Sequence, residues 1–279
     1  MSDQIPQAGM RSDFLDTGQW HLAVDISKNG FGAWLLPDES LGAPSRVIIR
    51  MQWHPSEEGL LQRIEDTVYD NPVVLDDYSA DIIVECDRQL WLPASLYPTD
   101  DDCADAYISV YGGDLLDVMV NDLGDEKCAF MLAPGLKSFM QRSFPGARIW
   151  SQQALLKQAS LQPHECFKCL LDIRQTSFDL ILLRRGELLS ASTHMWKSEA
   201  DIGYILLNIL QTYEAPTAET EIAFSGKRDI RQSLGKTLQP YFKSISQKNH
   251  DLDGKEIPTA VYLAINRKKR YAHHTRKIR

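Results

Sequence analysis

The sequence predicts an α/β protein made of two related half-domains that face one cleft. Residues 22–36 and 169–183 share one pattern: an apolar strand ending in Asp-Ile, a short polar turn, a Phe, and a second apolar strand closing on Leu-Leu. Asp25 and Asp172 fall in register without a gap, and five of the fifteen residues are identical. Apolar runs around a polar turn are typical of a β-hairpin. A hairpin that recurs in the second half indicates a duplicated unit.

The first half alternates strands and helices after its hairpin. Apolar runs indicate strands, and Ser, Thr or Asp ahead of an apolar repeat indicates the start of a helix. The acidic residues 100–102 therefore suit the positive end of a helix better than a cation site. We expect strands at 46–53, 80–86, 114–121 and 128–132, and helices at 55–69, from 99–102 to 111, at 134–142 and at 151–159.

The second half repeats this plan. Ser198 and Asp201 have the spacing of a capping box at the start of a helix. The same order of elements in both halves supports duplication over a chance likeness of two apolar hairpins. We expect a strand at 188–194, a helix at 198–212, a strand at 219–224, a Ser-Gly turn, a helix at 229–241 and an apolar helical segment at 258–265.

The composition is that of an ordinary globular protein. Of 279 residues, 43% are hydrophobic and 24% are charged. No apolar run approaches the roughly 18 residues of a membrane helix. The first residues lack the basic and apolar stretches of a signal peptide. Five cysteines without regular spacing fit a reducing compartment. We therefore expect a cytoplasmic protein without a membrane span.

Cys166 and Cys169, with His164 nearby, have the spacing of half a zinc site. A structural zinc site needs four ligands, and the other cysteines are isolated in the sequence. Small core residues at the start of a buried strand are the better interpretation. No metal ligand is predicted here.

Charge is unevenly distributed along the chain. Residues 267–279 hold seven basic residues and no acidic one, whereas the rest has 23 basic and 38 acidic residues. An acidic surface repels nucleic acid, so contact with nucleic acid or an anionic surface would go through this basic tail. Partner binding and simple solvation of the tail both stay open. Its basic residues are Arg267, Lys268, Lys269, Arg270, Arg276, Lys277 and Arg279.

Changes in composition divide the chain into four parts. The polar start, with scattered Gly and Pro, indicates a flexible arm. The repeated hairpin marks the start of each half. We expect an arm at 1–18, a first half-domain with an insertion at 19–162, a second half-domain at 163–266 and the basic tail at 267–279.

The order of elements resembles the actin-like ATPase fold, which is shared by actin, Hsp70, sugar kinases and actin-like proteins of bacterial division and pilus assembly. The resemblance covers most of residues 20–266. It implies two ribonuclease-H-like half-domains around a nucleotide cleft. More narrowly, the stretches 92–98, 144–147 and 223–226 resemble an uncharacterised bacterial family to which this fold has been assigned.

The resemblance implies three nucleotide loops, at 25–32, 172–179 and 224–227. Phosphate loops rely on glycine because N–H groups must converge closely on the anion. The first loop keeps Gly30 and a second glycine, and Ser27 and Lys28 supply a hydroxyl and an ammonium that suit phosphate.

The second loop has no glycine, which is a departure from family members that use ATP. A charge-assisted contact from Arg174 would replace backbone donors, but a solvated Arg at the tip of a hairpin is the expected state. In the third loop, Gly226 and Lys227 precede a helix whose N-terminus suits an anion. A strand-to-helix turn that needs one Gly explains the same residues equally well.

Asp25 and Asp172 are candidates for holding Mg²⁺ through water, as the equivalent acids do in active members of the fold. Each carboxylate would otherwise bond to N–H groups of its own turn. Both interpretations stay open for Asp25, and the turn is favoured for Asp172.

We predict a degenerate member of the fold that does not hydrolyse ATP and acts as an interaction or scaffold module for a protein partner. Hydrolysis needs a positioned water, a metal and neutralised phosphate charge together, so no catalytic residue and no cofactor is assigned. The alternative is a Mg-ATP-binding ATPase or nucleotide-gated switch, similar to pilus-assembly members. A sugar kinase ranks third, because no further acid after a strand stands out as its base.

Overall fold

The computed structural model describes residues 16–38, 41–53, 59–159, 166–252 and 255–264. These residues form two compact units. The first unit holds the described residues up to Gln152 together with Ala264, and the second is Gln153–Leu263. The basic tail, most of the arm and the start of the helix expected at 55–69 lie outside the described residues. The half-domain boundary expected after residue 162 stays a prediction.

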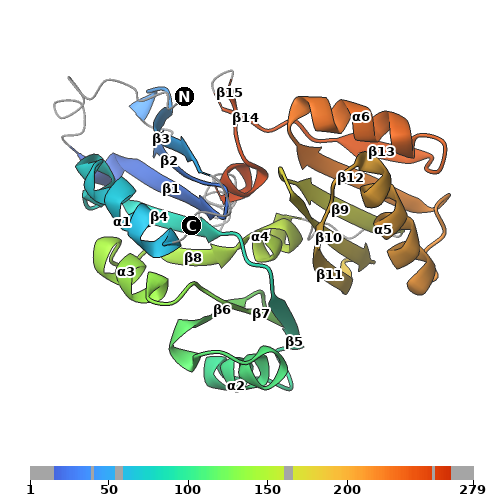
Figure 1. Cartoon of the computed structure of the whole chain (residues 1–279), viewed down its shortest axis with the longest axis horizontal. Helices are drawn as coiled ribbons and strands as arrows, with labels where there is room; N and C mark the ends of the chain where they lie inside the picture. Colours follow the sequence, from blue (N-terminus) through green and yellow to red (C-terminus); the bar gives the residue numbers. More distant parts are fainter. Residues whose placement is uncertain (1–15, 39–40, 54–58, 160–165, 253–254, 265–279) are drawn as a thin grey trace, which may run out of the picture. The chain divides into compact units, whose positions relative to one another are not determined.

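The first unit is built on a five-stranded mixed sheet (Figure 1). Its strands are β1 (Trp20–Ser27), β2 (Gly30–Pro37), β3 (Arg46–Gln52), β4 (Ser79–Val84) and β8 (Arg148–Ser151). β1 and β2 form an antiparallel hairpin, and β3 continues it on one side. On the other side β4 lies parallel to β1, and β8 lies parallel to β4. The order is β3-β2-β1-β4-β8.

The second unit contains a sheet of the same design. Its strands are β9 (Phe167–Ile173), β10 (Ser177–Arg184), β11 (Glu187–Met195), β12 (Thr220–Gly226) and β13 (Ser244–Gln247). The order is β11-β10-β9-β12-β13, with an antiparallel hairpin followed by two parallel strands. Order and direction match the first sheet strand for strand. The duplication predicted from the hairpins is confirmed.

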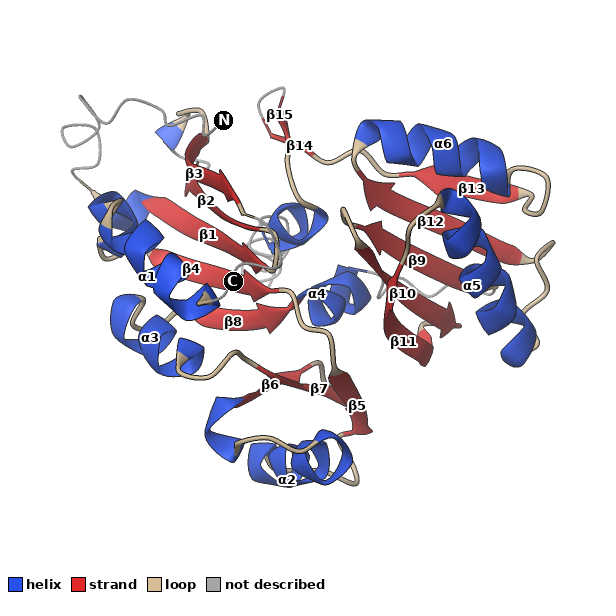
Figure 2. Cartoon of the chain, viewed as in Figure 1, coloured by secondary structure: helices blue, strands red, loops and turns tan. Residues whose placement is uncertain are grey.

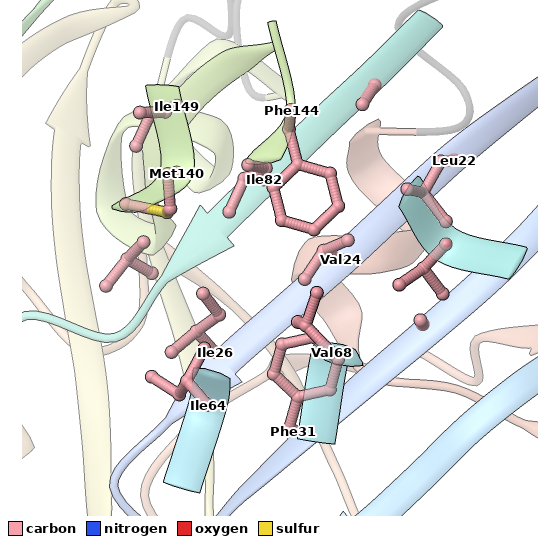
Figure 3. Close-up of a cluster of buried hydrophobic side chains, with 14 of the residues drawn as sticks. Leu22, Val24, Ile26, Phe31, Ile64, Val68, Ile82, Met140, Phe144 and Ile149 are labelled. Atoms are coloured by element: carbon pink, nitrogen blue, oxygen red, sulfur yellow. The ribbon is translucent and has the colours of Figure 1, made fainter. Parts of the chain in front are cut away.

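One face of the first sheet carries the core of the first unit (Figure 3). Because side chains alternate along a strand, Leu22, Val24 and Ile26 of β1 share that face, and all three are buried. Helices α1 (Leu60–Tyr69) and α3 (Leu136–Ser143) pack on it. Each large apolar side chain buried in this way contributes about 1.5–3 kcal/mol. The alternation leaves the intervening residues of β1 on the opposite face.

The second sheet is covered by helices on both faces. These helices are α4 (Gln152–Ala159), α5 (Glu199–Thr212), α6 (Arg228–Leu238) and the helical residues 259–264. α5 and α6 pack against the face that holds Leu171 and Phe224. On the other face, Leu156 of α4 and Leu263 pack against Ile181. Polar side chains of that second face are therefore enclosed.

A small subdomain is inserted between β4 and α3 (Figure 2). It consists of β5 (Gln89–Pro93), α2 (Asp100–Tyr111), the 3₁₀ helix η5 (Leu115–Asp117), β6 (Val118–Asp122) and β7 (Glu126–Met131). The strands form an antiparallel sheet in the order β5-β7-β6, and α2 packs on it through Cys103 and Tyr107. The expected capping of α2 is present, since Thr99 and Asp102 form a capping box. Gln89, the first residue of β5, pairs with Phe130 near the end of β7.

Four segments differ from the expectations, and the first is β5, a strand of five residues that the sequence did not indicate. A strand was expected from residue 114, but Leu115–Asp117 form the 3₁₀ helix η5. The Asp114 carboxylate accepts the Leu116 N–H at 3.0 Å and so bends the chain there. β8 precedes α4, and β13 follows α6; both strands are four residues long, which is too short to show a hydrophobic period. Shorter elements are η2 (Thr17–Gln19), η4 (Pro72–Leu75), β14 (Asp251–Leu252) and β15 (Lys255–Glu256).

Among the described residues, no helix is both long and apolar enough to cross a membrane.

Candidate functional site

The first expected phosphate loop is a two-residue turn, Lys28 and Asn29, between β1 and β2. Acidic side chains that follow β4 bind its donors. The Lys28 backbone N–H donates to Glu85 Oε2 at 3.3 Å, and the Lys28 ammonium pairs with Asp87. The Trp53 indole donates to the Lys28 carbonyl at 2.7 Å. Carboxylates of the chain thus hold donors that a phosphate would need.

Ser27 and the two glycines of this hairpin serve its own packing. Ser27 Oγ donates to the Gly30 carbonyl at 3.2 Å. A Cβ on Gly30 would collide with the Met51 carbonyl oxygen of β3, and a Cβ on Gly32 would collide with the Trp34 ring. We expected these glycines to open the loop for phosphate. Close approach of their neighbours is sufficient to explain both.

Asp25 lies on the face of the first sheet opposite α1 and α3, and it is half-buried. It is in register with Gly32 of β2 and Ile83 of β4. Within the described part of the chain, no group of three or more His, Cys, Asp or Glu side chains is placed to hold a metal ion. Mg²⁺ needs only one or two carboxylates with retained waters, so the assignment of Asp25 stays a prediction.

Arg174 of the second hairpin is enclosed, whereas we expected it to be solvated. Its side chain is only 13% exposed. The guanidinium pairs with Asp179 of β10 and lies 3.9 Å from the Asp172 carboxylate. Its Nε donates to Ser177 Oγ at 3.1 Å. The expectation of a solvated tip was wrong because two strand carboxylates on the same face need a cation when they are buried.

Asp172 of β9 is also bound differently from what we expected. It is 6% exposed, and it accepts the Ser225 hydroxyl at 3.0 Å and a hydrogen bond from Thr259. These partners lie on other elements, not in the turn of its own hairpin. Burial raises the pKa of Asp172 above its ordinary value, although Arg174 and the two hydroxyls oppose this shift. A carboxylate that is buried and hydrogen-bonded in this way is a poor ligand for a hydrated Mg²⁺.

Asp179 completes this cluster, and the sequence did not single it out. It accepts the Thr193 hydroxyl at 2.5 Å and the Gln153 amide at 3.2 Å, in addition to its pair with Arg174. It stands directly opposite Asp172 in the β9–β10 ladder. The sequence did contain a signal for Asp179, since it is an acid inside the apolar run of a buried strand. Such an acid needs a buried partner.

The third expected loop is a strand-to-helix turn that requires its glycine. Gly226 has a φ of +139°, and a Cβ there would lie 2.6 Å from the Ile173 carbonyl oxygen. Arg231 of α6 reaches back and donates to the Gly226 carbonyl at 2.7 Å. Lys227 is exposed at the N-terminus of α6, with no side-chain cap.

The predicted residues fall into two groups. In the second unit the β9–β12 pairing places Gly226 beside the strand end that leads to Arg174, and Asp172 beside Ser225. Lys227 follows Gly226 but points its charge to solvent. The first unit gathers the other group on its β1–β2 hairpin: Asp25, Ser27, Lys28 and Gly30.

The first unit contains a second buried polar cluster, which the sequence did not predict either. Asp81 of β4 is 1% exposed; it accepts Trp150 Nε1 at 3.1 Å and pairs with Arg148 Nε at 2.9 Å and His21 Nε2 at 3.0 Å. His21 Nδ1 lies 2.9 Å from Ser79 Oγ. Burial alone raises the pKa of Asp81, but His21, Arg148 and Trp150 together hold it below its ordinary value. The cluster fastens β1, β4 and β8 to one another.

A model for a family of proteins of unknown function, DUF3822, matches residues 12–245. The chain belongs to this family. The matched region holds both hairpins and all three expected nucleotide loops of the DUF3822 chain. No curated protein matches it.

Solved structures show the fold of the DUF3822 chain. A protein of unknown function with an actin-like ATPase fold, from Bacteroides thetaiotaomicron, is similar with a TM-score of 0.75 and 18% identity, over 90% of this chain and 98% of that one. The actin-like ATPase fold and the resemblance to an uncharacterised family with this fold are therefore confirmed.

Two further structures are more distant from the DUF3822 chain. The PilM–PilN type IV pilus biogenesis complex has a TM-score of 0.49 and 12% identity, over 84% of this chain and 89% of that one. Ethanolamine utilization protein EutJ from Carboxydothermus hydrogenoformans has a TM-score of 0.46 and 8% identity, over 94% and 92%. At this level of similarity neither structure informs the function.

Two of the three expected loops of the DUF3822 chain are thus engaged by the chain's own charges, whereas Lys227 of the third is exposed. Lys28 is engaged by Glu85 and Asp87, and Arg174 is engaged by Asp179 and Asp172. The enclosed charge-assisted bonds of Arg174 are the strong ones, whereas the exposed pair of Lys28 is weaker, and an incoming phosphate would have to displace both. The arrangement favours internal cohesion of each hairpin over anion binding.

Proposed function

We propose that this DUF3822 protein is a cytosolic member of the actin-like fold that neither binds nor hydrolyses ATP efficiently and acts as an interaction module for a protein partner. When the chain's own charges engage both hairpin phosphate loops, a protein of this fold keeps its surfaces for binding but loses a nucleotide-driven switch. Binding another protein is the activity that this loss leaves intact. Fold alone does not name the partner.

The observation that carries this proposal is the pair of carboxylates at the first turn. Glu85 accepts the Lys28 N–H, and Asp87 pairs with the Lys28 ammonium. A phosphate at this turn would meet two negative charges in place of free donors. Two like charges at 4 Å repel by about 1 kcal/mol in bulk water and by about 4 kcal/mol near a protein surface. The turn therefore opposes a triphosphate.

The second hairpin supports the same conclusion. Arg174 is the cation that would face phosphate, yet its charge is already shared between Asp179 and Asp172. Freeing it would leave two buried carboxylates without a cation, which costs several kcal/mol. This penalty would be subtracted from any affinity for a nucleotide.

The rival is a Mg-ATP-binding ATPase or nucleotide-gated switch. Asp25 is the residue that supports this rival, because it lies in β1 three residues before the first hairpin turn, on the face away from the core helices. A water-mediated Mg²⁺ at Asp25 would have to coexist with the acids around Lys28.

Thermal unfolding of the full chain, with and without millimolar Mg-ATP, separates the two functions. We expect no shift. A nucleotide present at 100 times its dissociation constant would add about 2.7 kcal/mol of stability. Stabilisation of that size that disappears in Asp25→Ala would refute the proposal and establish the rival.

A matched pair of variants tests the reason for the missing shift. Glu85→Gln/Asp87→Asn removes both acids at the first turn, and Mg-ATP or Mg-pyrophosphate should stabilise this variant more than the parent. Asp77→Asn/Asp125→Asn makes the same change of charge at two exposed positions and should behave like the parent. Equal responses from the two variants would show that the acids are not what closes the turn.

A further inference from the structure

The insertion of the first unit exposes apolar side chains around one turn. Val110, near the end of α2, is 59% exposed, and Leu115 and Leu116 of η5 are 48% and 76% exposed. η5 packs beside α2, and the hydrogen bond from the Leu116 N–H to Asp114 fixes the turn. Single exposed apolar residues are common, but adjacent ones that share a turn form a candidate contact surface.

The surroundings of this turn are acidic. Gln89–Met131 contains nine Asp or Glu residues and a single basic residue, Lys127. The Lys127 side chain is only 5% exposed, and its ammonium donates to the Pro98 carbonyl at 2.8 Å and to Asp100 at 3.2 Å. Residues 89–131, all of which the structure describes, therefore turn no basic side chain to solvent; the exposed Arg88, just before β5, lies over the Tyr111 ring of α2.

This combination selects the chemistry of the partner. Nucleic acid and anionic lipid would both be repelled by the acids. A basic peptide segment with a few apolar side chains fits both the acids and the leucines. Each exposed ion pair contributes little binding free energy, so apolar contacts have to supply most of the affinity at close range.

The chain itself carries such a segment. Residues 267–279 contain seven basic residues and no acidic one, and Tyr271 and Ile278 lie within the run. Ala264, the last described residue before it, belongs to the same unit as the insertion. Thirteen residues reach on the order of 45 Å when extended.

We propose that the insertion binds residues 267–279 of the same molecule through two exposed groups, which together we call the insertion surface: the apolar turn of Val110, Leu115 and Leu116, and Asp101 and Asp105 on another side of α2. The acids pair with the basic side chains, and the apolar turn covers Tyr271 and Ile278. The proposal goes beyond the proposed function and does not rest on it. Stabilisation by Mg-ATP would refute that function and leave this contact untouched.

Zero-length carbodiimide cross-linking of the full chain tests the contact, because it joins ammonium groups only to carboxylates that they touch. We expect links from the three lysines of residues 267–279 to acids within 100–125, in the monomer band. Asp101→Lys/Asp105→Lys should lower these links about fivefold or more, because each exposed ion pair changes the equilibrium a few-fold. Leu115→Ser/Leu116→Ser should lower them as well, which attraction between charges alone would not do.

The control variant is Glu187→Lys/Glu219→Lys, which makes the same change of charge at exposed positions of the second unit. Its links should stay within about twofold of the parent. Links spread over acids of both units, or links that Asp101→Lys/Asp105→Lys leaves unchanged, would overturn the proposal. Links found only in covalent dimers would assign the surface to a second copy and overturn it too.

A single-stranded RNA oligonucleotide serves as the competing ligand for residues 267–279. If the insertion surface holds this segment, Asp101→Lys/Asp105→Lys should bind the RNA more tightly than the parent does, beyond the increase given by Glu187→Lys/Glu219→Lys. Equal increases in the two variants would mean that the basic segment is not held by the insertion, and the proposal would fail.

Discussion

Replacing Arg174 by Met should reveal whether the turn cation of the second unit is a structural counter-ion. Met keeps much of the length and apolar stem of Arg but removes the charge. Asp179 and Asp172, which stand opposite each other in the β9–β10 ladder, would then face each other without a cation. The side chains of Arg174, Asp179 and Asp172 are 13%, 2% and 8% exposed, so water would compensate little for the lost positive charge.

The magnitude follows from this burial. Removing one partner of a buried ion pair costs about 3–5 kcal/mol. This range includes the cost of losing the hydrogen bond from Arg174 to Ser177. Because Arg174 is partly exposed, we expect a cost near the lower end of the range. We therefore expect a loss of about 3 kcal/mol, which corresponds to a fall in Tm of about 6–12 °C for a chain of this size.

The loss should depend on pH in a defined direction. Burial raises the pKa of Asp172 and Arg174 lowers it, so removing Arg174 raises this pKa further. A carboxyl group with a raised pKa binds its proton more tightly in the folded state, so stability falls as the pH rises through that pKa. Arg174→Met should therefore be closest to the parent near pH 4 and furthest from it at about pH 7–8.

Urea unfolding across this pH range is the assay, and Lys28→Met is the matched control. Lys28 is the turn cation of the first hairpin, but Lys28 and Asp87 are 50% and 54% exposed. Its loss should cost less than about 1 kcal/mol. The reasoning is refuted if Arg174→Met costs no more than Lys28→Met, or if its cost grows as the pH falls.

Three further predictions concern the framework of the site. Gly32→Ala should cost about 1–3 kcal/mol in urea unfolding, because its Cβ meets Trp34, and should cost clearly less in a Trp34→Phe background; equal costs would contradict a packing role. Asp81→Asn should cost about 3–5 kcal/mol near pH 7, and the deficit should narrow as the pH falls through the low pKa of Asp81; a deficit that widens would contradict the assignment. Thr99→Ala should cost about 0.5–2 kcal/mol in circular dichroism melts, because the Thr99 hydroxyl accepts the Asp102 N–H at the start of α2; no loss would show that this capping box contributes nothing.

The fold was accessible from the sequence because its evidence is local and repeated. The two hairpins keep an Asp, a Phe and a Leu-Leu pair in register, and the later strands and helices follow in the same order. The capping boxes at Thr99 and Ser198 are equally local, since both partners lie within four residues. Periodicity and caps depend on neighbours in the chain, which the sequence displays directly.

The site was less accessible because its contacts are distant in sequence. Arg174 looked like a solvated tip residue, and only the fold brings it under Asp179. Glu85 reaches Lys28 across 57 positions, which no spacing rule reveals. Gly32 illustrates a further limit, because a glycine needed for a neighbouring ring and a glycine needed for an anion look the same in a sequence.

The pairing of Gln89 with Phe130 has a consequence for how the two halves diverged. Because neighbouring strand residues lie about 5 Å apart, the chain leaves and rejoins the first half at almost the same point. The insertion is nevertheless joined to the parent sheet, because Asn121 of β6 donates to the Ile149 carbonyl at 2.8 Å and accepts the Ser151 N–H at 2.9 Å on β8, and Phe130 of β7 lies in the core of the first unit. The second half shows the state without it, since β12 runs through Gly226 directly into α6. A transplanted copy of residues 89–131 would therefore need a recipient sheet that offers the same backbone partners to Asn121 and the same core contacts to Phe130.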